Sequence, residues 1–198
     1  MTPVFRFFSH RKPLSIKRLT LCVALLGLLI GGCDAFQGVS AEPLTLTSEG
    51  SEPGWSRATG GGVSADCPSS WTLEVTNRAT RAWRCAHPAA HESPGGCGLT
   101  VYGAKGAQNL DELVKHMQPE IEAYSDESEL LSSERSTLGS HEAQSFVLDQ
   151  IVDEHQVRGW YRLALVDDTG WLAHCILPEE YIESDEEQVQ EILDRIDL

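Results

Sequence analysis

Hydrophobic and polar residues alternate along much of the chain after residue 70, with the period of two that is typical of half-buried β-strands. In the first such segment Trp71, Leu73 and Val75 share one side, and the polar residues between them occupy the other. Further strand-like segments follow, separated by short segments rich in turn-forming residues. The sequence therefore predicts strands at residues 71–76, 81–86, 98–103, 130–138, 143–152, 157–166 and 171–177.

Two other segments carry hydrophobic residues at helical spacing. In the first, Asn109 can cap a helix with Glu112 three residues later, and we expect Pro119 to kink or split this helix. Its hydrophobic positions are Leu110, Leu113, Val114, Met117 and Ile121. In the second, Ser184 and Glu187 form a capping box. The apolar face of that closing helix comprises Val189, Ile192, Leu193 and Ile196.

The order of these elements is three strands, a helix, four strands and a helix. Runs of strands, in place of strict alternation of strand and helix, favour an antiparallel arrangement. We therefore predict the α+β class for residues 67–198, with an antiparallel β-sheet covered by two helices. A domain of about 130 residues buries roughly two-thirds of the surface of its unfolded chain, so its core needs no metal.

Several short motifs resemble those of PsbP-like domains. They are Pro68-x-x-Trp71, Leu110-Asp-Glu-Leu113, Thr137-Leu138-Gly139 and the C-terminal EILDRIDL. The resemblance covers residues 67–198 and includes the element order. PsbP-like domains occur in the PsbP subunit of photosystem II, in a eukaryotic Ran-binding import factor and in many bacterial lipoproteins. The resemblance implies an adaptor, assembly factor or chaperone rather than an enzyme, and the cysteines of this chain depart from the usual pattern.

The N-terminus has the pattern of an export signal. Every charged residue before Cys33 is basic, and residues 19–30 form an apolar run of twelve. At about 1.5 Å per residue this run is shorter than the ~30 Å core of a bilayer. It ends in Ile30-Gly31-Gly32-Cys33, which resembles the lipobox of bacterial lipoproteins. We expect residues 1–32 to be a cleaved signal peptide and Cys33 to be lipidated; the alternative is that Cys33 follows an ordinary signal peptide.

Lipidation would place the protein in the cell envelope. Two or more acyl chains, such as palmitate, hold a protein firmly at a membrane, so we expect a tether that faces the periplasm or the exterior. Asp34 follows the acylated cysteine, and in enteric lipoproteins that resemble this one an aspartate there favours the inner membrane. Residues 33–66 are rich in Gly, Ser, Thr and Pro without sustained periodicity, which predicts a flexible linker.

The charge balance excludes one class of partner. The chain has 15 Lys and Arg residues against 30 Asp and Glu residues, a net charge of −15. Removal of residues 1–32 leaves 10 basic against 30 acidic residues, a net charge of −20. Such a surface repels phosphate backbones, so we expect no nucleic-acid partner.

Four cysteines fall within the predicted domain: Cys67, Cys85, Cys97 and Cys175. An even number in an exported protein favours two disulfides, and three pairings are possible from sequence alone. Cys85 and Cys97 flank a loop rich in Pro and Gly between two predicted strands. We therefore pair these two and leave Cys67 with Cys175.

A metal site is the alternative use of the same loop. Cys85, His87, His91 and Cys97 lie within thirteen residues, and zinc accepts such a ligand set. However, the spacing lacks the paired knuckles of zinc sites, and an oxidising compartment competes for the thiols. The main prediction is therefore no metal and no cofactor, with a metal-binding or small-ligand module at this loop as the alternative.

Catalytic motifs are incomplete throughout the chain. The segment at residues 62–66 lacks the last glycine of a nucleophile elbow, and the segment that begins at His141 has Ser145 where a zinc-binding histidine belongs. Trp160, Tyr161 and Trp171 lie on two neighbouring predicted strands and could form an aromatic binding platform, although packing beneath the helices is the favoured interpretation. For His174, a packing role on the sheet is likewise favoured over a hydrolase role. The sequence thus predicts a membrane-tethered lipoprotein, not an enzyme, that acts as a protein-binding or adaptor module.

Overall fold

The computed structural model describes residues 45–47 and 52–198, apart from residues 61, 79–80, 91–92 and 105. The described residues belong to one compact unit, Val39–Leu198. The predicted signal peptide, Cys33 and Asp34 therefore lie outside the described residues. Within the described part, no helix has the length and apolar character needed to cross a membrane.

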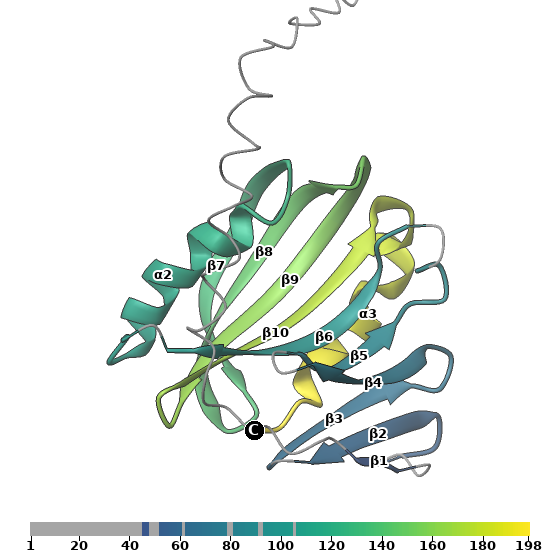
Figure 1. Ribbon diagram of the computed structural model, residues 1–198. Coiled ribbons are helices and arrows are strands. Elements are labelled where there is room, and N and C mark those ends of the chain that lie inside the picture. The colour runs from purple at the N-terminus through teal and green to yellow at the C-terminus, as the bar shows by residue number, and fades with distance from the viewer. Residues whose placement is uncertain (1–44, 48–51, 61, 79–80, 91–92, 105) are drawn as a thin grey trace, which may run out of the picture. The chain divides into compact units, whose positions relative to one another are not determined.

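The larger sheet in the described part is antiparallel and has seven strands, in the order β4-β5-β6-β10-β9-β8-β7 (Figure 1). The strands are β4 (Thr72–Arg78), β5 (Arg81–Ala86), β6 (Gly96–Gly103), β7 (Glu127–Leu138), β8 (His141–Val152), β9 (His155–Val166) and β10 (Thr169–Pro178). Each corresponds to a predicted strand. The last strand, β10, lies between β6 and β9, so it joins the N-terminal strands to the C-terminal ones.

A smaller sheet precedes the larger one and occupies much of the predicted linker. It consists of β1 (Thr45–Thr47), β2 (Trp55–Gly60) and β3 (Val63–Pro68), in that order and antiparallel. Val63, Ala65 and Cys67 are buried on β3. The prediction of a flexible linker was therefore wrong for these strands, because small side chains in a segment rich in Gly, Ser and Thr form part of the core.

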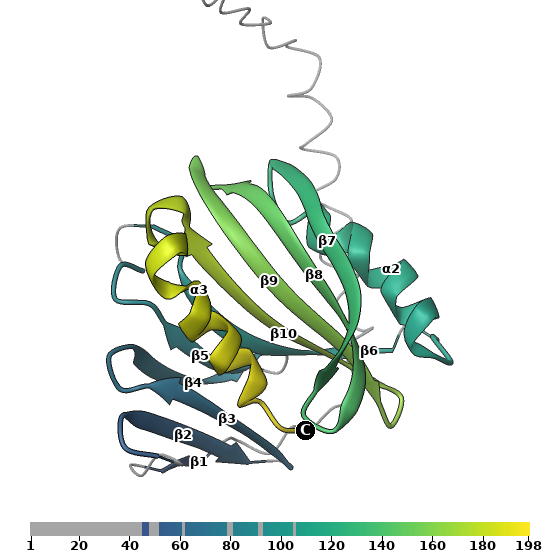
Figure 2. The ribbon, with the colours of Figure 1, turned by 180° about the vertical axis from the view of Figure 1, so that it is seen from behind.

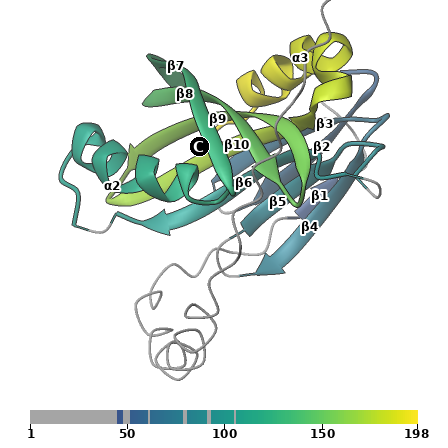
Figure 3. The same ribbon diagram turned by 90° about the horizontal axis from the view of Figure 1, so that it is seen from above.

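The two helices cover opposite faces of the large sheet, as the front and back views and the view from above show (Figures 1, 2 and 3). Helix α2 (Leu110–Glu122) buries Leu113 and Met117 against one face of β8, β9 and β10. Helix α3 (Glu179–Asp194) buries Ile192 and neighbouring residues between the other face and β3. The α+β class is confirmed, although the strands form two sheets and each helix covers only part of one face.

The helix boundaries agree only in part with the prediction. The Asn109 side chain caps α2 by accepting a hydrogen bond from the Glu112 amide at 3.0 Å, and α2 continues through Pro119 without being split. Helix α3 begins at Glu179, not after Ser184, because β10 leads directly into it. Two glutamates in its first turn favour this start, since negative charge is stabilising at a helix N-terminus.

The disulfides are Cys67–Cys85 and Cys97–Cys175, so both predicted pairs were wrong. Cys97 of β6 lies opposite Cys85 of β5 on one side and opposite Cys175 of β10 on the other. The position of β10 beside β6 brings Cys175 to Cys97, and β3 brings Cys67 to Cys85. All four cysteines are buried in the core between α3 and the sheet.

Tyr161 occupies the core beneath α2 and donates a hydrogen bond to the Gln150 side-chain oxygen on β8. Its ring lies over Gly159, where any Cβ would collide with it, so this position requires glycine. Burial raises the pKa of the Tyr161 phenol far above its ordinary value near 10.

This shift predicts a pH dependence of stability. Above about pH 10 the unfolded chain loses the Tyr161 proton that the folded protein retains, so the free energy of unfolding falls as pH rises, by about 1.4 kcal/mol per pH unit from this group. Below that pH Tyr161 contributes no pH dependence. Urea unfolding of Tyr161→Phe between pH 7 and 11 should show a shallower decline than the parent protein. Tyr124→Phe is the control, because Tyr124 is 69% exposed; equal slopes for all three proteins would contradict the prediction.

Candidate functional site

Strand β7 forms one edge of the large sheet and is exposed along most of its length. Within the described strands it pairs with β8 alone. Residues 127–135 are all exposed, and only Leu138 near the end of the strand enters the core. Such an edge presents backbone N–H and C=O groups that no neighbouring strand uses.

Exposed apolar side chains lie on this edge strand and just before it. In the described part of the chain, the large hydrophobic residues that are exposed are Tyr124, Leu130 and Leu131. The two leucines are 42% and 44% exposed and lie where the register between β7 and β8 shifts by one residue. A β-bulge of this kind turns successive side chains away from the regular alternation. We refer to Tyr124, Leu130, Leu131 and the rest of β7 as the edge surface.

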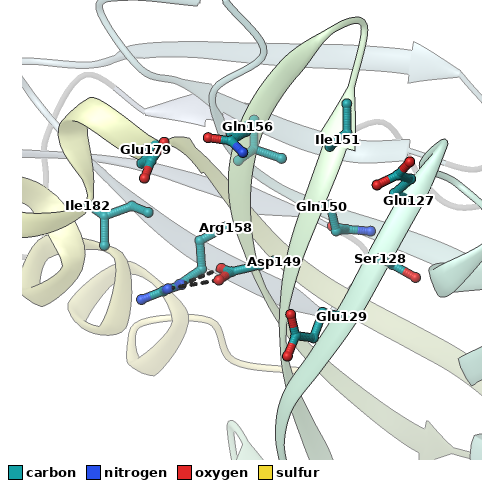
Figure 4. A pocket seen from close by; sticks show the side chains of 11 residues that line it. Glu127, Ser128, Glu129, Asp149, Gln150, Ile151, Gln156, Arg158, Glu179 and Ile182 are labelled. Atoms are coloured by element: carbon teal, nitrogen blue, oxygen red, sulfur yellow. Dashed lines mark hydrogen bonds and ion pairs between the residues drawn. The ribbon is translucent and has the colours of Figure 1, made fainter. Parts of the chain in front are cut away.

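A pocket of about 390 Å³ lies beside the edge surface, between β7, β8, β9 and the first turn of α3 (Figure 4). Charged residues from β7, β8, β9 and α3 line it, and Ile182 of α3 adds an apolar wall. The charged lining residues are Glu127, Glu129, Asp149, Arg158 and Glu179. Four carboxylates against one guanidinium make this pocket acidic.

Strand register explains why these side chains meet. Glu129 of β7 lies opposite Asp149 of β8, which in turn lies opposite Arg158 of β9. Residues that are directly opposite in antiparallel strands point to the same face, so the three form a row across the sheet. Glu127 belongs to a second row, two residues along β7. Figure 4 shows β7 on one side of the pocket and α3 on the other.

Arg158 is held by its neighbours. Its Nε and Nη2 atoms donate hydrogen bonds to the two Asp149 oxygens at 2.7 and 3.1 Å. The hydrogen bond to Asp149, the charge of Asp149 and the charges of Glu186 and Glu179 raise the pKa of Arg158. Because the guanidinium is already engaged by carboxylates, the pocket is suited to a cationic group rather than an anion.

The residues of the alternative metal site serve other purposes. Cys85 and Cys97 are in separate disulfides, so neither offers a thiolate. His87 is buried between Trp71 and Tyr181, where its Nδ1 accepts from the Ala89 amide and its Nε2 lies 2.7 Å from Asp185 of α3. His91 lies outside the described residues. The described residues contain no group of three or more His, Cys, Asp or Glu side chains placed to hold a metal ion.

The aromatic platform is also absent from this part of the structure. Trp160 and Tyr161 are successive residues of β9, so they point to opposite faces of the sheet. Both are at most 5% exposed, and each belongs to a different core cluster. His174 on β10 stacks on the Tyr161 ring at 6.4 Å, beside Gly98. The favoured interpretation of these residues as packing groups agrees with their placement.

The edge surface and the acidic pocket were not predicted from the sequence. The signal that could have found them is the adjacent pair Leu130-Leu131, because it breaks the alternation of a strand whose other residues are mostly polar and therefore indicate no buried face. Glu127, Glu129 and Glu134, which lie on either side of this pair, are the corresponding sequence signal for an acidic surface.

No protein-family model and no curated protein sequence matches this chain. Its fold is similar to that of the cyanobacterial PsbP protein CyanoP from Synechocystis sp. PCC 6803, with a TM-score of 0.52 and 9% identity over 81% of this chain and 95% of that one. It is also similar to LpqN, involved in cell envelope biogenesis of Mycobacterium tuberculosis, with a TM-score of 0.55 and 10% identity over 84% and 97%. These similarities show a PsbP-like fold. They confirm the predicted resemblance at the level of the fold.

Proposed function

We propose that the protein is a non-catalytic module of the cell envelope that binds a partner protein through the edge surface. The observation that carries the proposal is the exposure of the adjacent Leu130 and Leu131 on β7, which pairs with β8 alone among the described strands. Exposed apolar side chains that lie together, rimmed by polar residues, are typical of protein-binding surfaces. A fold shared with LpqN, which is involved in cell envelope biogenesis, supports the proposed compartment.

The proposed tether is a lipid on Cys33, supported by the basic, apolar and small-residue order of the N-terminus. Eleven residues lie between Cys33 and β1, and a flexible chain of that length has a typical reach of about 18 Å. The binding domain would then stand close to the membrane that carries the anchor. The acidic pocket adjoins the edge surface, so both belong to one docking region.

A co-purification experiment tests this function. Brief crosslinking in cells, followed by purification of tagged full-length protein in mild detergent, should recover a stoichiometric partner. Leu130→Glu with Leu131→Glu should reduce that recovery at least tenfold, since it places charge on the apolar contact. Lys115→Glu on the exposed face of α2 lowers the net charge by the same two units at a different place and should leave recovery unchanged.

The Cys33→Ala variant separates tethering from binding. It should move the protein to the soluble fraction while a purified partner still binds the domain. Equal recovery of the partner with the double leucine variant and the parent would show that the edge surface is not the docking site. Recovery of the protein alone in every sample would contradict the protein-binding function itself.

A further inference from the structure

We propose that β7 accepts an extended, basic segment of the partner protein as an additional antiparallel or parallel strand, with Lys or Arg side chains entering the acidic pocket. This inference rests on the proposed protein-binding function and names the partner's chemistry. The supporting features are the open edge of β7, the exposed leucines at its centre and the carboxylates beside it.

The length and exposure of β7 suit strand addition. It has 12 residues, as many as any other strand described, and β8 occupies only one of its sides. An added strand would hydrogen-bond to the open backbone groups, and alternate side chains would fall on the two faces of the sheet. On the α3 face those side chains would lie beside Glu127 and Glu129 and could reach the pocket.

Exposed apolar residues distinguish β7 from an edge strand that is only protected against pairing with other chains. Proteins blunt open edges with charges and bulges, and β7 has both. Leu130 and Leu131, however, expose more than two-fifths of their surface at the bulge itself. Exposed leucines promote association with another chain, so they oppose the protection that the neighbouring glutamates provide.

Charge complementarity determines which partner fits. Glu127, Glu129 and Glu134 of β7 would lie next to the added strand, and opposite charges on neighbouring strands are stabilising. Arg158 adds no site for an anion, because Asp149 holds it in two hydrogen bonds. A second copy of this chain would bring the same glutamates and a net charge of −15, so self-association through β7 is disfavoured.

The experiment measures peptide binding to the full-length lipidated protein in mild detergent. The probe is a fluorescent ten-residue peptide that alternates valine with lysine, compared with the same peptide carrying glutamate for lysine. We expect the lysine peptide to bind in a salt-dependent manner and the glutamate peptide not to bind. Glu127→Lys with Glu129→Lys should weaken binding of the lysine peptide at least tenfold.

Two controls separate strand addition from general attraction. Glu183→Lys with Glu187→Lys makes the same charge change at exposed positions of α3 and should have less than a threefold effect. A lysine peptide with an N-methyl group on every residue keeps its charge but lacks the backbone donors of both edges, and it should lose binding to the parent protein. Equal binding of the N-methylated peptide, or equal weakening by both charge variants, would overturn the inference.

Failure of this inference is distinguishable from failure of the proposed function. If the lysine peptide does not bind but the cellular partner is still lost with Leu130→Glu and Leu131→Glu, the edge surface binds a protein by another mode and strand addition is wrong. If no partner is recovered either, the protein-binding function is contradicted. Circular dichroism of each variant must match the parent protein, because only folded variants enter this comparison.

Discussion

Replacement of both Cys97 and Cys175 by alanine is expected to lower the free energy of unfolding by about 4.5 kcal/mol. The disulfide joins residues 78 positions apart, and the chain-entropy model relates a closed loop of that length to this stabilisation. Domains of this size have a total stability of about 5–15 kcal/mol, so the variant should be largely unfolded at elevated temperature. Urea unfolding at pH 7 of the parent protein and the variant measures the difference.

The second disulfide provides a matched comparison. Cys67 and Cys85 are 18 positions apart, so their joint replacement by alanine should cost less, about 3 kcal/mol. Both cysteines of a pair must be replaced together, because Cys85 lies opposite Cys97 and a lone thiol there could attack the remaining disulfide. A larger loss for the Cys67–Cys85 variant would contradict the loop-length argument.

Protease digestion and mass spectrometry of the non-reduced protein test the connectivity directly. Cleavage between the cysteines should leave Cys67 attached to Cys85 and Cys97 attached to Cys175. A peptide that contains both Cys85 and Cys97 as partners would contradict this pairing. It would instead support the pairing of Cys85 with Cys97 that the sequence predicted.

Strands were predictable wherever large apolar side chains marked the buried face. In β9, for example, Trp160 and Tyr161 are both buried because both faces are covered, and the strand ends in an apolar run at residues 163–166. Strands β2 and β3 escaped prediction because Ala58 and Ala65 occupy buried positions where little hydrophobic surface is available. Small buried residues in a segment rich in Gly and Ser resemble a linker by composition alone.

The disulfide pairs depended on contacts between distant parts of the chain. Cys175 meets Cys97 because β10 is inserted between β6 and β9, and local sequence around either cysteine does not reveal that order. The loop between Cys85 and Cys97 correctly indicated that the two residues are cross-strand neighbours. Their proximity alone did not identify the disulfide pairs, because Cys85 and Cys97 each have a second cysteine nearby.

The candidate site could be predicted from the sequence only in part. Leu130 and Leu131 interrupt the alternation of β7, but their exposure follows from the position of β7 at the edge, which is a property of the whole sheet. An aromatic platform at Trp160 and Tyr161, the disfavoured alternative, conflicts with strand geometry, because successive residues of a strand point to opposite faces. His87 entered the sequence analysis only as a ligand of the alternative metal site, and in the structure its Nε2 lies 2.7 Å from a carboxylate oxygen of Asp185 of α3.

Asp66→Ala is expected to lower the free energy of unfolding by about 2 kcal/mol, because it removes a buried carboxylate that accepts two hydrogen bonds from the partly exposed Arg57 guanidinium. Asp66 is 1% exposed and accepts hydrogen bonds from Arg57 Nε at 2.7 Å and Nη2 at 2.9 Å. Its second oxygen lies 3.7 Å from Nη1 of Arg195, just after α3. The carboxylate therefore links β2, β3 and the C-terminal end of α3, and its loss leaves two arginines that repel each other.

Asp149→Ala is the matched control for this prediction. Asp149 and Arg158 form the same two-bond pair between neighbouring strands, at 2.7 and 3.1 Å, and are likewise separated by nine residues. Asp149 is 43% exposed, so its removal should cost less than about 1 kcal/mol. Urea unfolding of both variants at pH 7 compares two pairs that differ mainly in burial. Equal losses would show that burial of Asp66 does not determine its contribution, and a negligible loss for Asp66→Ala would show that β2 and β3 are not secured to α3 through this residue.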